Sequence, residues 1–170
     1  MSDMMDPRPQ LHRRVGKCLK RMRELIGLTT MEVADDLNLM RNLIIRWENG
    51  RFTKDVAMYV DYIYENTKHY KQGTVPMYFI DYYFSEEIQE RLRYYKTIGY
   101  AFYYMRRKVL DKGIYQMAKE SGTGVHTIED IERNVYVDKY MLRQYANYIY
   151  KMSGPACNHK VLKIANEIYK

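Results

Sequence analysis

The chain has 170 residues, which is enough for one compact domain or two small ones. Hydrophobic residues make up 46% of it, which excludes intrinsic disorder, and 19 Tyr and 12 Met predict a core of amphipathic and flexible side chains. The formal net charge of +7 favours an acidic partner such as nucleic acid.

The N-terminus and the cysteines indicate where the protein works. Residues 1–10 are polar and contain two Pro and two Asp, so we expect a flexible arm rather than a signal peptide. No window of about 18 apolar residues occurs, so no membrane span is expected. Cys18 and Cys157 lie far apart and suggest neither a disulfide framework nor a metal site, which favours the reducing cytoplasm.

The first predicted helix is basic and amphipathic. Its apolar residues Val15, Leu19, Met22 and Ile26 recur at spacings of 4, 3 and 4, and Gly27 is expected to end it. Basic residues and one histidine crowd this segment, at His12, Arg13, Arg14, Lys17, Lys20, Arg21 and Arg23. They form either a surface that binds nucleic acid or a helix face exposed to solvent.

Three shorter helices are predicted next. The second spans about 29–37, capped by one of its first two threonines, and Asn38 follows in a tight turn that favours a left-handed conformation. The third spans about 41–48 and is stopped by Asn49-Gly50, and the fourth spans roughly 54–64. The residues expected to face inward are Val33, Ala34, Leu37, Val56, Val60 and Ile63.

Residues 67–97 are predicted to link this first unit to the rest of the chain. Residues 71–76 form a plain connector, and 85–96 form a linker helix with Ser85 as its cap. The segment is rich in tyrosine, at Tyr78, Tyr82, Tyr83, Tyr94 and Tyr95. These side chains suit either a core or the interface of a homodimer.

A second segment repeats the first at an offset of 83 residues, which becomes 84 from Leu28 and Lys112 onward. One residue has therefore been inserted between its first two helices, and matches in the same order indicate a duplication. The first copy contains Val15-Gly16, Met22-Arg23, Ala34, Ile44 and Trp47-Glu48-Asn49-Gly50, and the second contains Ile98-Gly99, Met105-Arg106, Ala118, Ile128 and Ile131-Glu132-Arg133-Asn134. In the second copy, Ile98, Ala101, Phe102, Met105 and Met117 are also expected to face inward.

The first copy resembles the Cro/C1 (Xre-type) helix-turn-helix family, whose fold is lambda-repressor-like, and Trp47-Glu48-Asn49-Gly50 is the most specific part of the match. The second copy resembles it more distantly. The resemblance implies an all-α protein with two tandem helix-turn-helix units, at 11–66 and 98–152. The linker at 67–97 joins them, and a C-terminal helix lies at 153–170.

The resemblance also implies a buried ion pair in each unit, Arg23 with Glu48 and Arg106 with Glu132, with a structural role. Trp47 is expected in the core. The third helix of the first unit would enter the major groove of double-stranded DNA, with phosphate contacts on either side. Mapped onto this sequence, the base-contacting residues are Arg41, Asn42 and Arg46, and the phosphate-contacting residues are Thr30, Arg51 and Lys54.

Some residues depart from the family pattern. Met40 replaces the usual Ser or Thr cap, and Leu43 and Ile45 place apolar groups near the base-contacting face, where they would meet thymine methyls or pack against protein. In the second copy this face contains two carboxylates, Glu129 and Asp130, which phosphates would repel. This favours a partner surface or a spacer over a second DNA-contacting unit.

The expected function is a sequence-specific, repressor-like transcriptional regulator, with a homodimer or another protein bound through the second unit and the Tyr-rich linker. The alternative is a protein-interaction module, such as an antirepressor, antitoxin or inhibitor, on the same scaffold. The four histidines are scattered and form no catalytic constellation, so we expect no enzyme, no metal and no cofactor.

Overall fold

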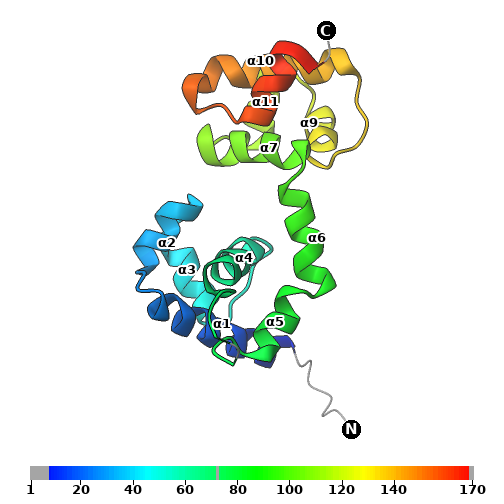
Figure 1. The fold of residues 1–170 in the computed structure, drawn as a ribbon. Helices are drawn as coiled ribbons and strands as arrows, with labels where there is room; N and C mark the ends of the chain where they lie inside the picture. The colour runs from blue at the N-terminus through cyan, green and yellow to red at the C-terminus, as the bar shows by residue number, and fades with distance from the viewer. Residues whose placement is uncertain (1–7, 72, 169–170) are drawn as a thin grey trace. The chain divides into compact units, whose positions relative to one another are not determined.

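The computed structural model describes residues 8–71 and 73–168. Over these residues the protein is all-α, as the sequence predicts, and it has eleven α-helices and no strand. The chain divides into two compact units, with the boundary along the sequence between Leu92 and Arg93, and Figure 1 shows the helices of each unit. Within the described part of the chain, no helix combines the length and the apolar character that a membrane span needs.

Unit 1 is built around its first helix, which packs against three others in the same unit, α3, α4 and α5, while α2 packs against α3. The fully buried centre includes Leu19, Trp47 and Tyr59. The helices are α1 (Arg8–Leu25), α2 (Thr30–Leu37), α3 (Arg41–Glu48), α4 (Val56–Thr67), α5 (Met77–Tyr83) and α6 (Glu86–Tyr95), the last of which crosses into unit 2.

Local signals explain where α2 and α3 begin and end. Thr29 caps α2 in a capping box, accepting from the backbone N–H of Glu32, whose carboxylate accepts from Thr29 N. Asn38 ends α2 in the left-handed region at φ 53°, as the sequence predicts. Gly50 ends α3 at φ 82°, where Arg51 N donates to the carbonyl of Arg46.

Two expected boundaries in unit 1 are wrong. Helix α1 already begins at Arg8, so residues 8–10 are helical and not part of an arm, whereas residues 1–7 lie outside the described residues. Helix α4 begins at Val56 rather than Lys54 and continues to Thr67. The chain before it forms a turn, because Val56 N donates to the carbonyl of Thr53 and the Thr53 hydroxyl accepts from the indole of Trp47 at 3.0 Å.

The linker contains a helix that the sequence analysis missed. Helix α5 starts after Pro76 and packs against α1 and α4, so this part of the predicted linker belongs to unit 1. Its Tyr83 ring stacks on Tyr64 with centroids 3.9 Å apart, and its hydroxyl donates to Asp61 at 2.9 Å. Tyr82 and Tyr83 are therefore core residues rather than a free interface.

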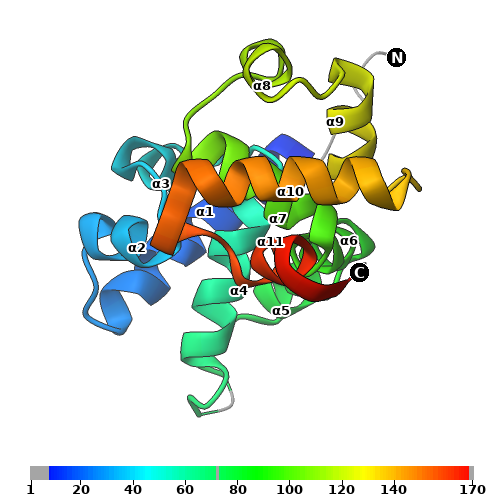
Figure 2. The ribbon, with the colours of Figure 1, turned by 90° about the horizontal axis from the view of Figure 1, so that it is seen from above.

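Unit 2 repeats much of this plan and adds a C-terminal segment. Its core contains Phe102, Met117, Ile128 and Tyr145. Ile98, expected to face inward, is 37% exposed. The 15-residue α10 packs against α11, and Figure 2 shows the two together. The elements are α7 (Ile98–Tyr104), η1 (Met105–Val109), α8 (Ile114–Ser121), α9 (Val125–Glu132), α10 (Lys139–Ser153), η2 (Gly154–Ala156), α11 (His159–Lys163) and η3 (Ile164–Ile168).

The extra residue of the second copy is absorbed by a π-helical turn. Helix α7 changes to π geometry at η1, where Leu110 N donates to the carbonyl of Met105, five residues back. Arg106 nevertheless keeps its bond to the following loop, since its guanidinium donates to the carbonyl of Lys112 at 3.0 Å. In unit 1, Arg23 donates to the carbonyl of Leu28 at 2.9 Å. The insertion therefore leaves this contact unchanged.

Candidate nucleic-acid interface

Helix α3 separates its residues into an inner and an outer face. Ile44, Trp47 and Glu48 are buried, whereas Arg41, Asn42 and Arg46 are exposed. Asn42 and Arg46 are four residues apart, so they share the side of α3 that faces away from the buried residues. Arg41 is the first residue of the helix and lies seven residues before Glu48, so it is on the side of that glutamate. The three exposed side chains offer hydrogen-bond donors over the first two turns of α3.

Arg41 and Thr30 lie together between α3 and the start of α2. The Arg41 Nε donates to the Thr30 hydroxyl at 3.0 Å, which fixes the direction of the arginine side chain. Both residues line an open depression of about 600 Å³ between the end of α1 and these two helices. Lys20 of α1 also lines it, so its cations come from two elements.

The remaining predicted phosphate contacts lie beyond the C-terminal end of α3. Arg51 and Lys54 are both exposed, and they precede α4 in the loop that Trp47 and Thr53 hold in place. Thr30 is half-buried and forms the first residue of α2. The six predicted residues therefore border the same helix, three along it and three at its two ends.

The apolar residues near this face occupy different places. Met40 precedes α3, makes no side-chain capping bond and is 74% exposed. Ile45 is half-buried and lines the depression beside Arg41, while Leu43 is half-buried without lining it. An apolar group thus lies directly beside the polar surface of α3.

A buried polar network fixes α3 to the rest of unit 1. Arg23 on α1 donates to both carboxylate oxygens of Glu48, at 2.6 and 3.0 Å, and the Tyr59 hydroxyl donates to the same carboxylate at 2.5 Å. The hydrogen bond to Glu48 raises the pKa of Arg23, and burial, followed by the bond to Glu48, raises the pKa of Tyr59. Three elements are therefore joined at one carboxylate.

A glycine on α1 allows this close packing, and the sequence analysis did not assign it a role. A Cβ added to Gly16 would lie 2.6 Å from the carbonyl oxygen of Trp47 and 2.7 Å from that of Glu48. Gly99 is in the matching place, 2.6 Å from the carbonyl oxygen of Glu132. The appearance of both glycines in the repeat was the signal that pointed to such a contact.

Unit 2 contains the same anchor but a different outer surface. Arg106 donates to both oxygens of Glu132, at 2.7 and 2.9 Å. On the outer side of α9, the carboxylate of Glu129 lies 3.7 Å from His126 Nδ1 and 4.0 Å from a guanidinium nitrogen of Arg133. The helix that corresponds to α3 thus presents a mixture of charges instead of the donors of Arg41 and Asn42.

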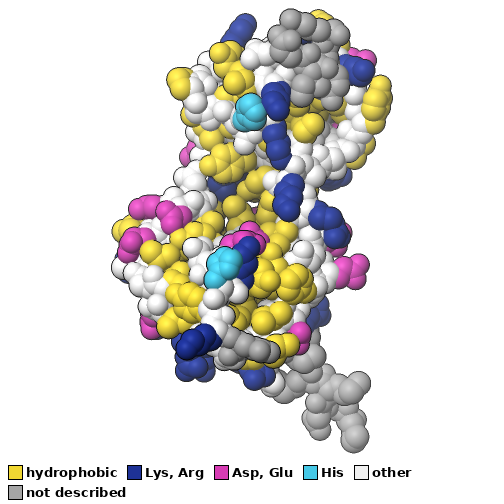
Figure 3. Space-filling view, in the orientation of Figure 1, with side chains coloured by type: hydrophobic (Ala, Val, Ile, Leu, Met, Phe, Trp, Pro, Cys, Tyr) yellow, Lys and Arg dark blue, Asp and Glu magenta, His cyan; other side chains and the backbone are white. Residues whose placement is uncertain are grey.

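Charge is unevenly distributed over unit 1. Figure 3 shows acidic side chains gathered over α2, whose exposed carboxylates are Glu32, Asp35 and Asp36. Lys and Arg side chains gather along the edge where α1 runs (Figure 3). Polyanion binding is therefore favoured away from the exposed carboxylates of α2.

Among the residues that the structure describes, no three His, Cys, Asp or Glu side chains gather as metal ligands would. No family model, no curated protein and no solved structure matches the chain. What the chain does must therefore be inferred from its own side chains.

Proposed function

We propose that the protein is a sequence-specific, repressor-like regulator that binds double-stranded DNA through unit 1. In this proposal the chain contains two tandem helix-turn-helix units of the Cro/C1 type, and α3 enters the major groove. The observation that carries it is the exposed trio Arg41, Asn42 and Arg46 on a helix whose inner face is fixed by a buried network.

The chemistry of the three side chains fits bases. A guanidinium donates two bonds to the O6 and N7 of guanine, and an Asn amide pairs with the N6 and N7 of adenine. The bond from Arg41 to Thr30 reduces the conformations that the arginine must lose on binding. Thr30 itself begins α2, and the N-terminal end of a helix favours a phosphate.

The parallel contacts in both units support tandem copies of one motif. Each unit has an Arg–Glu pair that joins its first helix to the helix containing the glutamate, and each has a glycine where these helices cross. In each unit, the second residue after the end of the glutamate-containing helix has a left-handed backbone conformation, Gly50 in unit 1 and Asn134 in unit 2. Geometry this similar follows naturally from a duplication.

A protein-interaction role for unit 2 is the second candidate function. Large aromatic side chains lie on its surface, with Tyr136 85% exposed and Tyr140 68% exposed. Exposed Tyr is enriched at protein interfaces, and Glu129 on α9 disfavours phosphate. In this proposal unit 1 binds DNA while unit 2 binds another copy or a different protein.

The test is selection from a random-sequence duplex library, followed by affinity measurements at several salt concentrations. Arg41→Ala should relax one base position and weaken binding by about 1–3 kcal/mol, whereas Arg51→Ala should weaken all sequences equally and lower the salt slope by about one. Arg107→Ala removes the same charge from an exposed residue of unit 2 and is the matched control.

An enriched motif that is lost with Arg41→Ala but kept with Arg107→Ala would support the proposal. If no motif is enriched and both variants lose equal affinity, α3 does not contact bases. A protein partner captured by unit 2 in the absence of DNA binding would favour the interaction module.

A further inference from the structure

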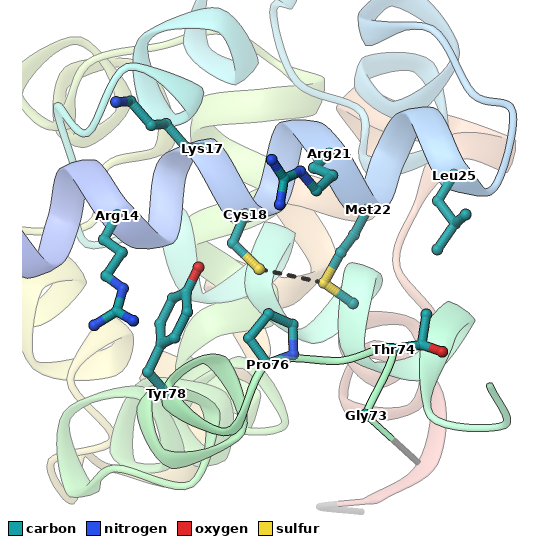
Figure 4. Close-up of a pocket in the computed structure, with 10 residues that line it drawn as sticks. All are labelled: Arg14, Lys17, Cys18, Arg21, Met22, Leu25, Gly73, Thr74, Pro76 and Tyr78. Atoms are coloured by element: carbon teal, nitrogen blue, oxygen red, sulfur yellow. Dashed lines mark hydrogen bonds between the residues drawn. The ribbon is translucent and has the colours of Figure 1, made fainter. Parts of the chain in front are cut away.

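A cavity of about 620 Å³ lies in unit 1, between α1 and the segment that leads into α5. Its walls are one side of α1 and residues Gly73, Thr74, Pro76 and Tyr78 (Figure 4). Pockets that hold small organic ligands have volumes of about 300–1,000 Å³. This cavity is therefore large enough for a molecule of that class.

The floor of the cavity is apolar and tightly fixed. Cys18 and Met22 are only 4% and 2% exposed, and the Cys18 thiol donates to the Met22 sulfur at 3.5 Å (Figure 4). Burial raises the pKa of Cys18, so the thiol is the form that lines the floor. Pro76 and the Tyr78 ring complete an apolar surface suited to a hydrocarbon or aromatic group.

The rim of the cavity is positively charged. Arg14, Lys17 and Arg21 follow one another at spacings of three and four along α1, so they lie on one face of the helix. The Arg14 guanidinium lies 4.0 Å from the centroid of the Tyr78 ring, which holds it at the edge of the apolar floor. Among the residues that the structure describes, none that lines the cavity has a carboxylate.

The cavity is separate from the proposed DNA-binding surface. Lys20 and Glu24, on another side of α1, line the depression beside α3, and neither lines the cavity. Lys17 and Arg21 therefore belong to one surface of α1 and Lys20 to another.

We propose that this cavity binds a small amphipathic anion, with its apolar body on the floor and its anionic head at the rim. The combination of three cations with an apolar floor selects against neutral and cationic molecules of the same size. The inference does not depend on DNA binding, since it rests on the walls of the cavity alone.

The test uses decanoate as the probe, titrated into the full chain by calorimetry below its micellar concentration. Decanol and decyltrimethylammonium have the same alkyl chain with a neutral and a cationic head. Decanoate should bind saturably, and both analogues should bind more weakly. Equal binding of all three would overturn the proposal, because the rim would then contribute nothing.

Two double variants of equal charge separate the cavity from general electrostatics. Lys17→Gln/Arg21→Gln removes rim cations, and Arg13→Gln/Lys20→Gln removes two exposed cations of the same helix that do not line the cavity. The first should weaken decanoate roughly tenfold and the second by no more than about twofold. Equal losses would refute a specific site.

A steric variant tests the position of the apolar body. Thr74 is exposed at the cavity wall, so Thr74→Trp should fill the space without disturbing the core. Circular dichroism should show an unchanged helix content, and decanoate binding should be lost. Undiminished binding to this variant, with the fold intact, would place the ligand elsewhere and overturn the proposal.

Discussion

Tyr59 in unit 1 and Tyr145 in unit 2 occupy matching buried places next to the Arg–Glu pair, but their hydroxyl groups differ in bonding. Tyr59 donates to Glu48 at 2.5 Å. Tyr145 is fully buried, and its hydroxyl has no hydrogen-bond partner among the described residues. Deleting each hydroxyl with a Phe substitution should therefore have opposite effects on stability.

The magnitudes follow from the two environments. Tyr59→Phe removes a hydrogen bond to a charged group, which contributes about 1.5–3 kcal/mol, and leaves Glu48 bonded to Arg23 alone. Tyr145→Phe removes a buried hydroxyl that is unsatisfied, a condition that costs about 1–3 kcal/mol. We expect unit 1 to lose about 2 kcal/mol and unit 2 to gain about 1 kcal/mol.

The two units can be followed separately in urea. Trp47 is the only tryptophan in the chain, it is fully buried, and its ring centroid lies 6.2 Å from that of Tyr59. Its fluorescence therefore reports the unfolding of unit 1. Unit 2 is followed by amide hydrogen exchange in α10, which contains Tyr145.

Two results would refute this reasoning. If Tyr145→Phe destabilises α10 by as much as Tyr59→Phe destabilises unit 1, the Tyr145 hydroxyl has a partner such as an ordered water. If Tyr59→Phe changes nothing, the short bond to Glu48 contributes no net stability and the matched comparison fails.

Three further predictions concern the stability of unit 1, which is measured by unfolding in urea followed through the fluorescence of Trp47. Gly16→Ala places a Cβ 2.6 Å from a backbone carbonyl, so α1 must move away from α3, and unit 1 should lose about 3 kcal/mol; a midpoint equal to that of wild type would contradict this. Thr29→Ala removes the capping box of α2 and should cost about 1 kcal/mol, with Thr29→Ser as the control that retains the cap. Burial, and then the bond to Asp36, raise the pKa of Tyr62 from 10.0 to about 12. Because the folded state holds the Tyr62 proton more tightly than the unfolded state, Tyr62 contributes fully to the free energy of unfolding below pH 10, and this contribution is lost as the pH rises to about 12. Tyr62→Phe should therefore flatten the dependence of that free energy on pH between pH 10 and about 12. An unchanged slope would show that Tyr62 does not cause this dependence.

Much of the α2–α3 region could be predicted because its signals are local. Thr29 with Glu32, Asn38 and Gly50 each act on the backbone next to them, and the structure uses all of them. The structure also brings together each expected Arg–Glu pair. The roles of Arg41, Asn42 and the other residues in DNA binding stay predictions.

What could not be predicted depends on distant partners. The segment Met77–Tyr83 is aromatic without a clear polar face, and its partners Asp61 and Tyr64 belong to another helix, so α5 was missed. The cations of the first helix form one cluster in the sequence. In the structure they are divided among different faces of α1, and the cavity exists only because the segment before α5 packs beside one of them.

The matching ion pairs also have a consequence for how the chain reaches its native state. A misassembled chain in which Arg23 bonds to Glu132 satisfies the same charges with the same geometry, so these pairs do not tell one unit from the other. Discrimination must come from shape, such as the indole of Trp47 where unit 2 has Ile131. During synthesis Glu48 emerges long before Glu132, and the correct partner is the first available. During refolding from denaturant both glutamates are present at the same time, so Arg23 can pair with Glu132. During synthesis on the ribosome this crossed pairing is disfavoured, because Glu48 is present first.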